Sequence, residues 1–296
     1  MIKIDTFSKV IPNTLFQSPM NPMRATLAFF VLLLMFVQVS GQQGKLSKEI
    51  NAHSKGISVW WAGHNSWLIK SGNMLVATDL WLENETRFAP APITPEELAN
   101  LDVSFVTHAH DDHFNKYTSS ILLEKSNCIF VMPESCLAKA RELHIPDHRI
   151  RVAKPREAFE VKGIKVNPVR AIHGNANFAI YYEANLQDCG YVITLDSVTF
   201  LQPGDSYLLE DHLFLKHVNV LFFSPTEHNT YIDRSVIMIN ALHPDFIFPQ
   251  HHSTIRYDEA NRFWAKGYPD EVRILLSDEL KKKYHILKPG DQVVIH

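Results

Sequence analysis

The feature that most constrains this chain is the segment THAHDDHF at residues 107–114. It continues VSFVTH (103–108), an apolar stretch that predicts a buried strand, so a loop is expected at the carboxyl end of that strand. Alternate side chains of extended backbone point to the same side, so His108 and His110 can face one point. Asp112 and His113 lie in the turn that follows and can face a second point nearby. Imidazole and carboxylate ligands together suit zinc, and also manganese or iron. A solvated polar loop is the alternative, but four ligand-type residues in six positions favour a metal-binding loop: His108, His110, Asp112 and His113.

Composition excludes some classes of protein. The 296 residues include 16 histidines and carry a net charge of −3, which does not provide the basic surface of a general nucleic-acid binder. We therefore expect no nucleic-acid partner. The three cysteines, Cys128, Cys136 and Cys189, form no C-x-x-C motif and are expected to be buried thiols, with a single disulfide as the alternative.

The amino-terminal part of the chain has the pattern of a targeting segment. Residues 25–39 are apolar and uncharged, and they are too short for a comfortable bilayer crossing, which needs about 20 apolar residues. A basic residue precedes this run and small residues follow it, which is typical of a secretory signal peptide spanning about residues 23–41. We expect a secreted or periplasmic protein, with an uncleaved membrane anchor as the alternative. Residues 1–44 are then the targeting segment, and residues 45–296 are one domain.

Hydrophobic patterns predict an α/β fold in the mature part. Strands come first, separated by Gly-His-Asn and Gly-Asn turns, and strand–helix alternation follows. The same order of strands and strand–helix alternation then repeats. A capping box at Thr94 and Glu97 predicts a short helix at 94–100. Two mixed sheets packed face to face with helices on the outer faces would bury such strands, giving a four-layer αββα sandwich. The strands are expected at 57–62, 66–70, 74–80, 103–108, 128–132, 157–162, 164–172, 178–184, 190–195, 198–201, 218–223 and 246–249. The other helices are expected at 116–125 and 134–144 and near 207–216, 231–242 and 259–266.

The motif H-x-H-x-D-H after a strand resembles that of the metallo-β-lactamase superfamily, and the resemblance covers about residues 57–255. The opening WWAGHNSWLIKSGNMLVATDLW, residues 60–81, resembles one branch of that superfamily. This branch contains the ascorbate-6-phosphate lactonase-like and the N-acylphosphatidylethanolamine phospholipase D-like hydrolases. Its opening commonly reads W-x-G-H-x-S/T-x-L-I followed by I-D-P. Here Asp79 takes the place of the aspartate, and Leu80 stands where proline is usual.

The resemblance implies three further ligands and a centre of two divalent cations, expected to be zinc with manganese or iron as alternatives. Candidates for the ligands lie in AIHGN, PGDSY and FPQHH, namely His173, Asp205 and His251, with His252 as a competitor for the last position. By resemblance, the first cation binds His108, His110 and His173. The second cation binds Asp112, His113 and His251, and Asp205 bridges the two. A hydroxide on the two cations is the implied nucleophile.

Three other residues are candidates for roles beside the metals. Asp79 ends a predicted strand and is expected to fix the orientation of a ligand histidine, with a turn-capping role as the alternative. His64, in the first hairpin turn, is a candidate for supporting the site or contacting the substrate. His228, in SPTEHNTY, is a catalytic candidate together with Asp112, although a surface position is as plausible for His64 and His228.

The sequence thus predicts a hydrolase that attacks an ester, lactone or phosphodiester bond in a small-molecule or lipid-like substrate. A β-lactamase and a catalytically inactive metal-binding protein of the same fold are the alternatives. A di-iron oxygen or nitric-oxide reductase of this fold typically has glutamate at the position of His110, so that activity is not expected. Contact with a membrane is expected only through an uncleaved amino-terminal segment.

Overall fold

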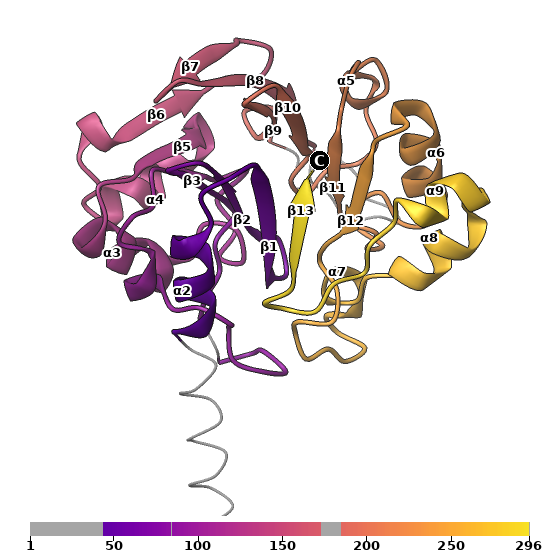
Figure 1. The fold of residues 1–296 in the computed structure, drawn as a ribbon, viewed down its shortest axis with the longest axis horizontal. Helices are drawn as coiled ribbons and strands as arrows, with labels where there is room; N and C mark the ends of the chain where they lie inside the picture. Colours follow the sequence, from indigo (N-terminus) through magenta and orange to yellow (C-terminus); the bar gives the residue numbers. More distant parts are fainter. Residues whose placement is uncertain (1–43, 84, 173–184, 296) are drawn as a thin grey trace, which may run out of the picture. The chain divides into compact units, whose positions relative to one another are not determined.

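The computed structural model describes residues 44–83, 85–172 and 185–295, and their strands form two mixed sheets (Figure 1). The seven-stranded sheet has the order β13-β1-β2-β3-β4-β5-β6 and the six-stranded sheet has the order β12-β11-β10-β9-β8-β7. The first sheet contains β1 Ile57–Gly63, β2 Ser66–Ser71, β3 Met74–Thr78, β4 Val103–Phe105, β5 Ile129–Pro133, β6 Ile150–Ala153 and β13 Gln292–Ile295. The second contains β7 Phe159–Val161, β8 Ile164–Arg170, β9 Cys189–Leu195, β10 Val198–Gln202, β11 Val220–Phe223 and β12 Phe246–Pro249.

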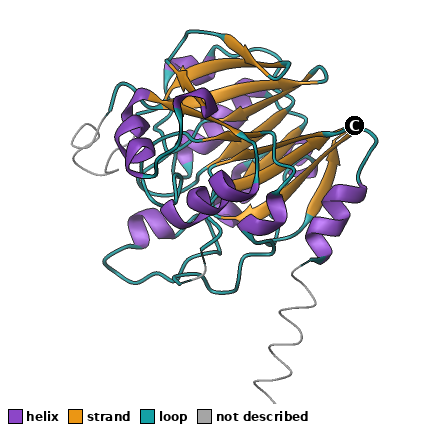
Figure 2. Ribbon diagram, turned by 90° about the vertical axis from the view of Figure 1, so that its left-hand side faces the viewer, coloured by secondary structure: helices purple, strands orange, loops and turns teal. Residues whose placement is uncertain are grey.

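Helices lie on the outer sides of both sheets, so the predicted αββα sandwich is confirmed (Figures 1 and 2). Beside the first sheet lie α2 Lys45–Ala52, α3 Lys116–Lys125 and α4 Leu137–Glu142. Beside the second sheet lie α5 Glu210–Leu213, α6 Asp233–Leu242, α8 Pro269–Leu275 and α9 Asp278–Lys282. Helix α7 Arg262–Ala265 instead packs on Trp81 and Ile255 in the loops. The described residues also include the short 3-10 helices η1 Pro95–Leu98, η2 Glu134–Cys136 and η3 Asp147–Arg149.

Strand β1 shows why the sequence gives buried layers on both faces of a sheet. Its residues alternate, so that Val59 and Trp61 pack between the two sheets while Trp60 and Ala62 pack under the helices of the first sheet. All four side chains are fully buried, which explains the continuous apolar run. The tryptophans at 60, 61 and 67 fill the core, as expected for large aromatic residues.

Several predicted elements differ from the structure in length or type. The helix expected at 94–100 is the 3-10 helix η1, although its capping box is present. The helix expected near 207–216 shortens to α5, and the one at 134–144 divides into η2 and α4. The strand expected at 178–184 lies outside the described residues. Strand β6 and the segment from α8 to β13 were not predicted. Strand β13 is in the sheet only because it pairs with β1, which lies near the opposite end of the described chain.

Two smaller predictions also have an outcome. The three cysteines are buried and free, as expected. Across the described ranges, no helix combines the length and the apolar character needed to cross a bilayer. The apolar run at 25–39 lies outside those ranges, so the division of the chain at residue 44 stays a prediction.

Parallel pairing sets where the functional loops lie. In the first sheet β3, β4, β5 and β6 run parallel, and in the second sheet β10, β11 and β12 run parallel. The loops that follow β4, β10 and β12 therefore leave their sheets at carboxyl ends, where side chains can converge without disturbing the core.

Candidate metal centre

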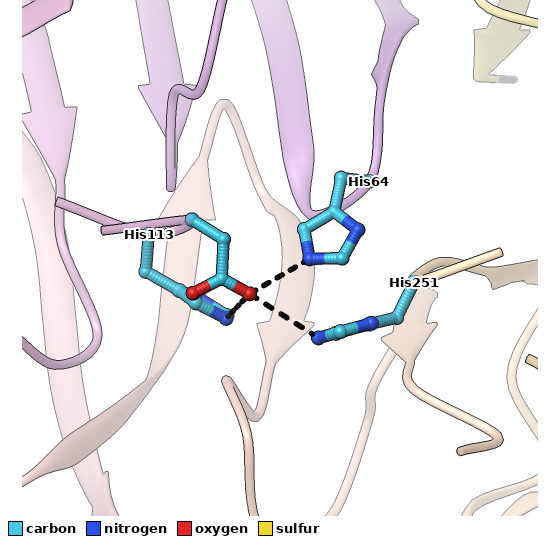
Figure 3. A group of neighbouring side chains, drawn as sticks. His64, His113 and His251 are labelled. Atoms are coloured by element: carbon cyan, nitrogen blue, oxygen red, sulfur yellow. Dashed lines mark hydrogen bonds and ion pairs between the residues drawn. The ribbon is translucent and has the colours of Figure 1, made fainter. Parts of the chain in front are cut away.

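Four separate loops bring ligand-type side chains to one place between the two sheets. His64 lies in the β1–β2 turn, the 107–114 segment follows β4, Asp205 follows β10, and His251 follows β12. Figure 3 shows His64, His113 and His251 around one carboxylate oxygen, which belongs to Asp112. These residues are up to 187 positions apart in the sequence, counted from 64 to 251, so the cluster exists only in the folded chain.

Asp112 is the common neighbour of three imidazole rings. Its Oδ2 lies 2.9 Å from His64 Nε2 and 3.7 Å from the Nε2 atoms of both His113 and His251. The rings of His64, His113 and His251 are buried, whereas the Asp112 side chain keeps 18% of its surface exposed. One carboxylate surrounded by imidazole nitrogens is an arrangement that suits a divalent cation.

The 107–114 loop also directs two histidines toward each other. His108 Nε2 lies 3.1 Å from His110 Nδ1, and the ring centroids of His108 and His113 are 4.0 Å apart. His108 is buried and His110 is exposed, so among the described residues solvent reaches this side of the cluster at His110.

Asp205 connects the two sides of the cluster. Its Oδ1 lies 3.4 Å from His113 Nε2, while its Oδ2 lies 3.2 Å from His251 Nε2 and 2.7 Å from His228 Nε2. The turn that carries Asp205 packs tightly on Thr107. Gly204 adopts a φ of +66°, and a Cβ atom there would lie 2.7 Å from the Thr107 Cβ, so only glycine permits this approach.

Ligand atoms from these residues form three groups within which all atoms lie within 4.8 Å of one another. The groups overlap, because His113, Asp205 and His251 each belong to two of them. The groups are His64 with Asp112, His113 and His251; His108 with His113 and Asp205; and Asp205 with His228 and His251.

His251, and not His252, points into the cluster. The backbone of His251 has a φ of +58° and donates from its N–H to the His64 carbonyl oxygen at 3.1 Å. His252 turns away, stacks on Trp61 with a centroid distance of 4.7 Å, and contacts the Pro249 carbonyl oxygen through Nε2. Burial lowers the pKa of His252 to about 4, so this imidazole is a neutral part of the core.

His251 provides the test of whether a cation fits. Among the described residues, neither ring nitrogen of His251 makes a hydrogen bond, and Nε2 has only its ion-pair contacts with the carboxylates of Asp205 and Asp112, although the ring is fully buried. A buried polar atom without a partner is costly, and a cation bound at Nε2 would compensate one of the two. Histidine nitrogens and aspartate oxygens together are the donor set of zinc, manganese and iron. The residues present therefore fit divalent cations.

Asp79 fixes the orientation of His113. Its Oδ2 accepts from His113 Nδ1 at 2.9 Å and from the Thr107 hydroxyl at 2.8 Å, and its Oδ1 accepts from the Thr107 N–H at 2.8 Å. With Nδ1 donating to Asp79, the Nε2 atom of His113 is left to face the cluster. Burial raises the pKa of Asp79, while its contacts with His113 and Thr107 oppose that rise.

The cluster residues strongly perturb one another in the metal-free chain. Burial alone would lower the pKa of His113, but the charges of Asp205, Asp112 and Asp79 outweigh it and raise this pKa well above its usual range. Burial would raise the pKa values of Asp112 and Asp205, but the neighbouring histidines outweigh it and hold both well below their usual range. The site thus favours carboxylates that remain charged.

The structure places each predicted site residue as follows. His108, His110, Asp112, His113, Asp205 and His251 lie at the cluster, and Asp79 supports it from behind. His173 lies outside the described residues. His228 is buried rather than on the surface, with Nε2 toward Asp205 and Nδ1 beside the Thr226 hydroxyl at 3.0 Å.

His64 lies closer to the ligands than the sequence suggested. It belongs to a candidate ligand group, and burial, followed by the effect of His251, lowers its pKa to about 3. A left-handed φ of 53° holds it at the hairpin tip, where its N–H donates to the Thr254 hydroxyl at 2.8 Å. Sequence reasoning missed Asn65, whose Nδ2 lies 2.8 Å from His113 Nε2; its position beside His64 in the turn was the only available signal.

Comparisons with known proteins agree with this architecture. A family model described as "Beta-lactamase superfamily domain" matches residues 58–251, the span that contains the whole cluster. A metal-dependent hydrolase of Pyrococcus horikoshii is 24% identical over 244 residues, which cover 80% of this chain and 99% of the relative. A protein of Escherichia fergusonii named "Probable L-ascorbate-6-phosphate lactonase" is 23% identical over 278 residues, which cover 76% of this chain and 75% of the relative.

Solved structures show the same fold at low sequence identity. The metallo hydrolase Igni18 of Ignicoccus hospitalis has a TM-score of 0.64 at 16% identity, covering 81% of this chain and 98% of that one. An isothiocyanate hydrolase from Delia radicum gut bacteria also has a TM-score of 0.64 at 16% identity, covering 80% and 98%. The di-iron β-hydroxylase CmlA of Streptomyces venezuelae has a TM-score of 0.61 at 12% identity, covering 82% and 55%.

Proposed function

Since this chain belongs to the beta-lactamase superfamily, we propose that it is a metal-dependent hydrolase whose centre holds two divalent cations. One observation carries the number of cations. Asp205 lies within 4.8 Å of a ligand nitrogen of His108, which is assigned to the first cation, and its Oδ2 lies 3.2 Å from the Nε2 atom of His251, which is assigned to the second. A carboxylate that lies between the ligands of two cations is suited to bridging them, as in other two-metal hydrolases.

The residues of the cluster divide into roles around such a centre. His108, His110, His113, His251, Asp112 and Asp205 would hold the cations, with His173 as a further candidate. Two cations supply a water of lowered pKa and polarise the oxygen of the bond that is cleaved. Asp79 keeps the Nε2 atom of His113 available, and His64 holds Asp112 in place through its 2.9 Å contact.

His228 is assigned to the substrate side of the reaction. Its Nδ1 lies beside the Thr226 hydroxyl at 3.0 Å and the Phe263 carbonyl oxygen at 3.3 Å, which fixes the ring. Its Nε2 lies 2.7 Å from Asp205 Oδ2, at the edge of the cluster. From this position the imidazole would stabilise charge that develops on the substrate, or return a proton to the leaving group.

The proposed substrates are small or lipid-like esters, lactones and phosphodiesters. Support comes from the resemblance of the opening hairpin to lactonase-like and phospholipase-like hydrolases, and from the similarity to a protein named as a lactonase. Zinc is the proposed native metal, since imidazole and carboxylate ligands suit it best, and manganese and iron are its competitors.

Metal analysis followed by a substrate panel tests this function. The purified protein is loaded with zinc, manganese or iron, and its metal content is measured by mass spectrometry. Turnover of a lactone, bis-p-nitrophenyl phosphate and nitrocefin is then compared. We expect two equivalents of metal and hydrolysis of the lactone or the phosphodiester. A single equivalent would refute the two-cation centre, and no turnover of an ester, lactone or phosphodiester would refute the hydrolase. Turnover of nitrocefin alone would identify a β-lactamase instead.

We also propose that the protein is exported, on the basis of the apolar run at residues 25–39. The protein is expressed with its full amino-terminal segment, and the secreted or periplasmic fraction is collected. Sequencing of the purified amino terminus should then begin near Gln42. An intact amino terminus in a membrane fraction would indicate an anchor instead, and a purely cytosolic product would refute export.

A further inference from the structure

A pair of buried glutamines lies beneath the metal centre, between the two sheets. Gln202 ends β10, and Gln250 directly follows β12. The two side chains bond to each other twice, because Gln250 Nε2 donates to Gln202 Oε1 at 2.8 Å and Gln202 Nε2 donates to Gln250 Oε1 at 3.1 Å. Both residues are completely buried.

The remaining bonds of the pair reach across to the first sheet. Trp67 in β2 donates from Nε1 to Gln250 Oε1 at 2.8 Å, and Gln202 Nε2 donates to the Thr78 hydroxyl in β3 at 3.1 Å. On the second sheet, Gln250 Nε2 donates to the Ser224 hydroxyl at 3.2 Å. The Gln202–Gln250 pair therefore links both sheets at the end where the ligands lie.

All polar atoms of the two amides are used. The Gln250 oxygen accepts two hydrogen bonds and its nitrogen donates two. The Gln202 nitrogen also donates two, and its oxygen accepts one from Gln250 and one from the Gly204 N–H at 3.3 Å. A fully satisfied buried network specifies one relative arrangement of its members, whereas apolar side chains pack in several.

The two glutamines and their hydrogen-bond partners lie next to residues of the metal centre in the sequence. Gln250 precedes His251, Thr78 precedes Asp79, and Gln202 is bonded to Gly204, which precedes Asp205. Around the pair the core is aromatic, with Trp67 and Phe222 stacked at 4.4 Å. Apolar residues of the same size would fill this space, so packing alone does not explain two amides here.

We propose that Gln202 and Gln250 are positioning residues of the metal centre. They hold Asp205 and His251 of the second sheet in register with Asp79 and its partner His113 of the first. In this way they set the affinity of the shared site for cations. This inference rests on the proposed two-cation centre and adds residues that touch neither cation nor substrate.

Three variants test the proposal in the full chain. Gln250→Met and the double variant with Gln202→Met remove the amides at similar side-chain length, and the double variant leaves fewer amide atoms without partners. The control is Ser71→Ala, which removes a bond from Ser71 to Asp196 that also joins the two sheets, but at the end opposite the centre. Zinc affinity is measured by competition with a chelator, the spectrum of the cobalt-substituted protein reports ligand geometry, and thermal unfolding is recorded without metal.

We expect both methionine variants to bind zinc about 10- to 100-fold more weakly, the range for changes just outside the ligands, and to show altered cobalt spectra. Ser71→Ala should keep the wild-type affinity and spectrum even where its unfolding temperature falls. Wild-type affinity and spectrum in the folded double variant would overturn the positioning role of the two glutamines but would leave the proposed function standing. A wild-type chain that binds no divalent cation would overturn the proposed function and, with it, this inference.

Discussion

Replacement of Asp79 by asparagine tests the reasoning on the metal centre most directly. The new side chain has the same shape, and its oxygen can still accept from the Thr107 N–H, now 2.8 Å from Oδ1. Its NH₂ group, however, takes the place of Oδ2, which lies 2.9 Å from His113 Nδ1. Two donors would face each other if Nδ1 kept its proton, so the neutral ring, which is the form that binds a cation, would carry its proton on Nε2, the atom that faces Asp205 at 3.4 Å.

The size of the effect follows from this change of tautomer. An imidazole with its proton on Nε2 offers no lone pair to a cation there, and changes of this kind cost about 10- to 100-fold in metal affinity. That factor corresponds to about 1.4 to 2.7 kcal/mol of binding free energy. The metal-free chain also loses a hydrogen bond to a charged group, worth about 1.5 to 3 kcal/mol. Relief of the burial penalty that raises the Asp79 pKa offsets part of that loss.

Zinc competition with a chelator measures the affinity, and urea unfolding measures the stability of the metal-free chain. Asp102→Asn is the matched control, because Asp102 accepts from the Leu75 N–H at 3.0 Å at the opposite ends of β3 and β4. We expect the control to bind zinc as the wild type does. Wild-type zinc affinity in folded Asp79→Asn would refute the argument that Asp79 sets the tautomer of His113.

Three further outcomes are expected. Asp112→Ala should remove the second metal equivalent and lower the hydrolysis rate by several orders of magnitude, and near-normal turnover would refute the two-metal mechanism. Gly204→Ala should destabilise the chain by about 1–3 kcal/mol more than Gly163→Ala, because both have positive φ but only Gly204 lacks space for a Cβ; equal urea midpoints would contradict this. The hydrogen bond from Arg156 holds the pKa of Asp211 well below its usual range, while burial opposes it. The stability that Asp211→Asn removes should therefore be constant above pH of about 5 and shrink as the pH falls below about 4, and a loss that grows in acid would contradict it.

Local patterns in the sequence were sufficient for the elements that carry the ligands. The apolar stretch at 103–106 and the polar run after it gave β4 and the 107–114 loop, because a buried strand must be followed by a loop that can expose its side chains. Helix α3 agrees with its predicted bounds of 116–125. The short helices were harder, since η1 and α5 depend on contacts made after folding and not on a long amphipathic pattern.

The centre itself shows the limit of such patterns. Spacing placed His108, His110, Asp112 and His113 together, since residues so close in the chain cannot lie far apart. For Asp205 and His251, the sequence offered only a resemblance, because nothing local says which distant loops meet. The choice of His251 over His252 depends on a left-handed backbone at 251, which turns one imidazole into the cluster and leaves the other on Trp61.

The sequence by itself determined the chemistry of this protein: a loop of imidazoles and a carboxylate at a strand end, and strands that had to be buried on both faces. Tertiary structure alone decided that His64 lies against Asp112, that Asp205 faces both sides of the cluster, and that two glutamines lie beneath it. The physical reason is that ligand type is a property of single residues. Convergence within a few ångströms depends on how two sheets pack, and on hydrogen bonds between residues that are far apart in the chain.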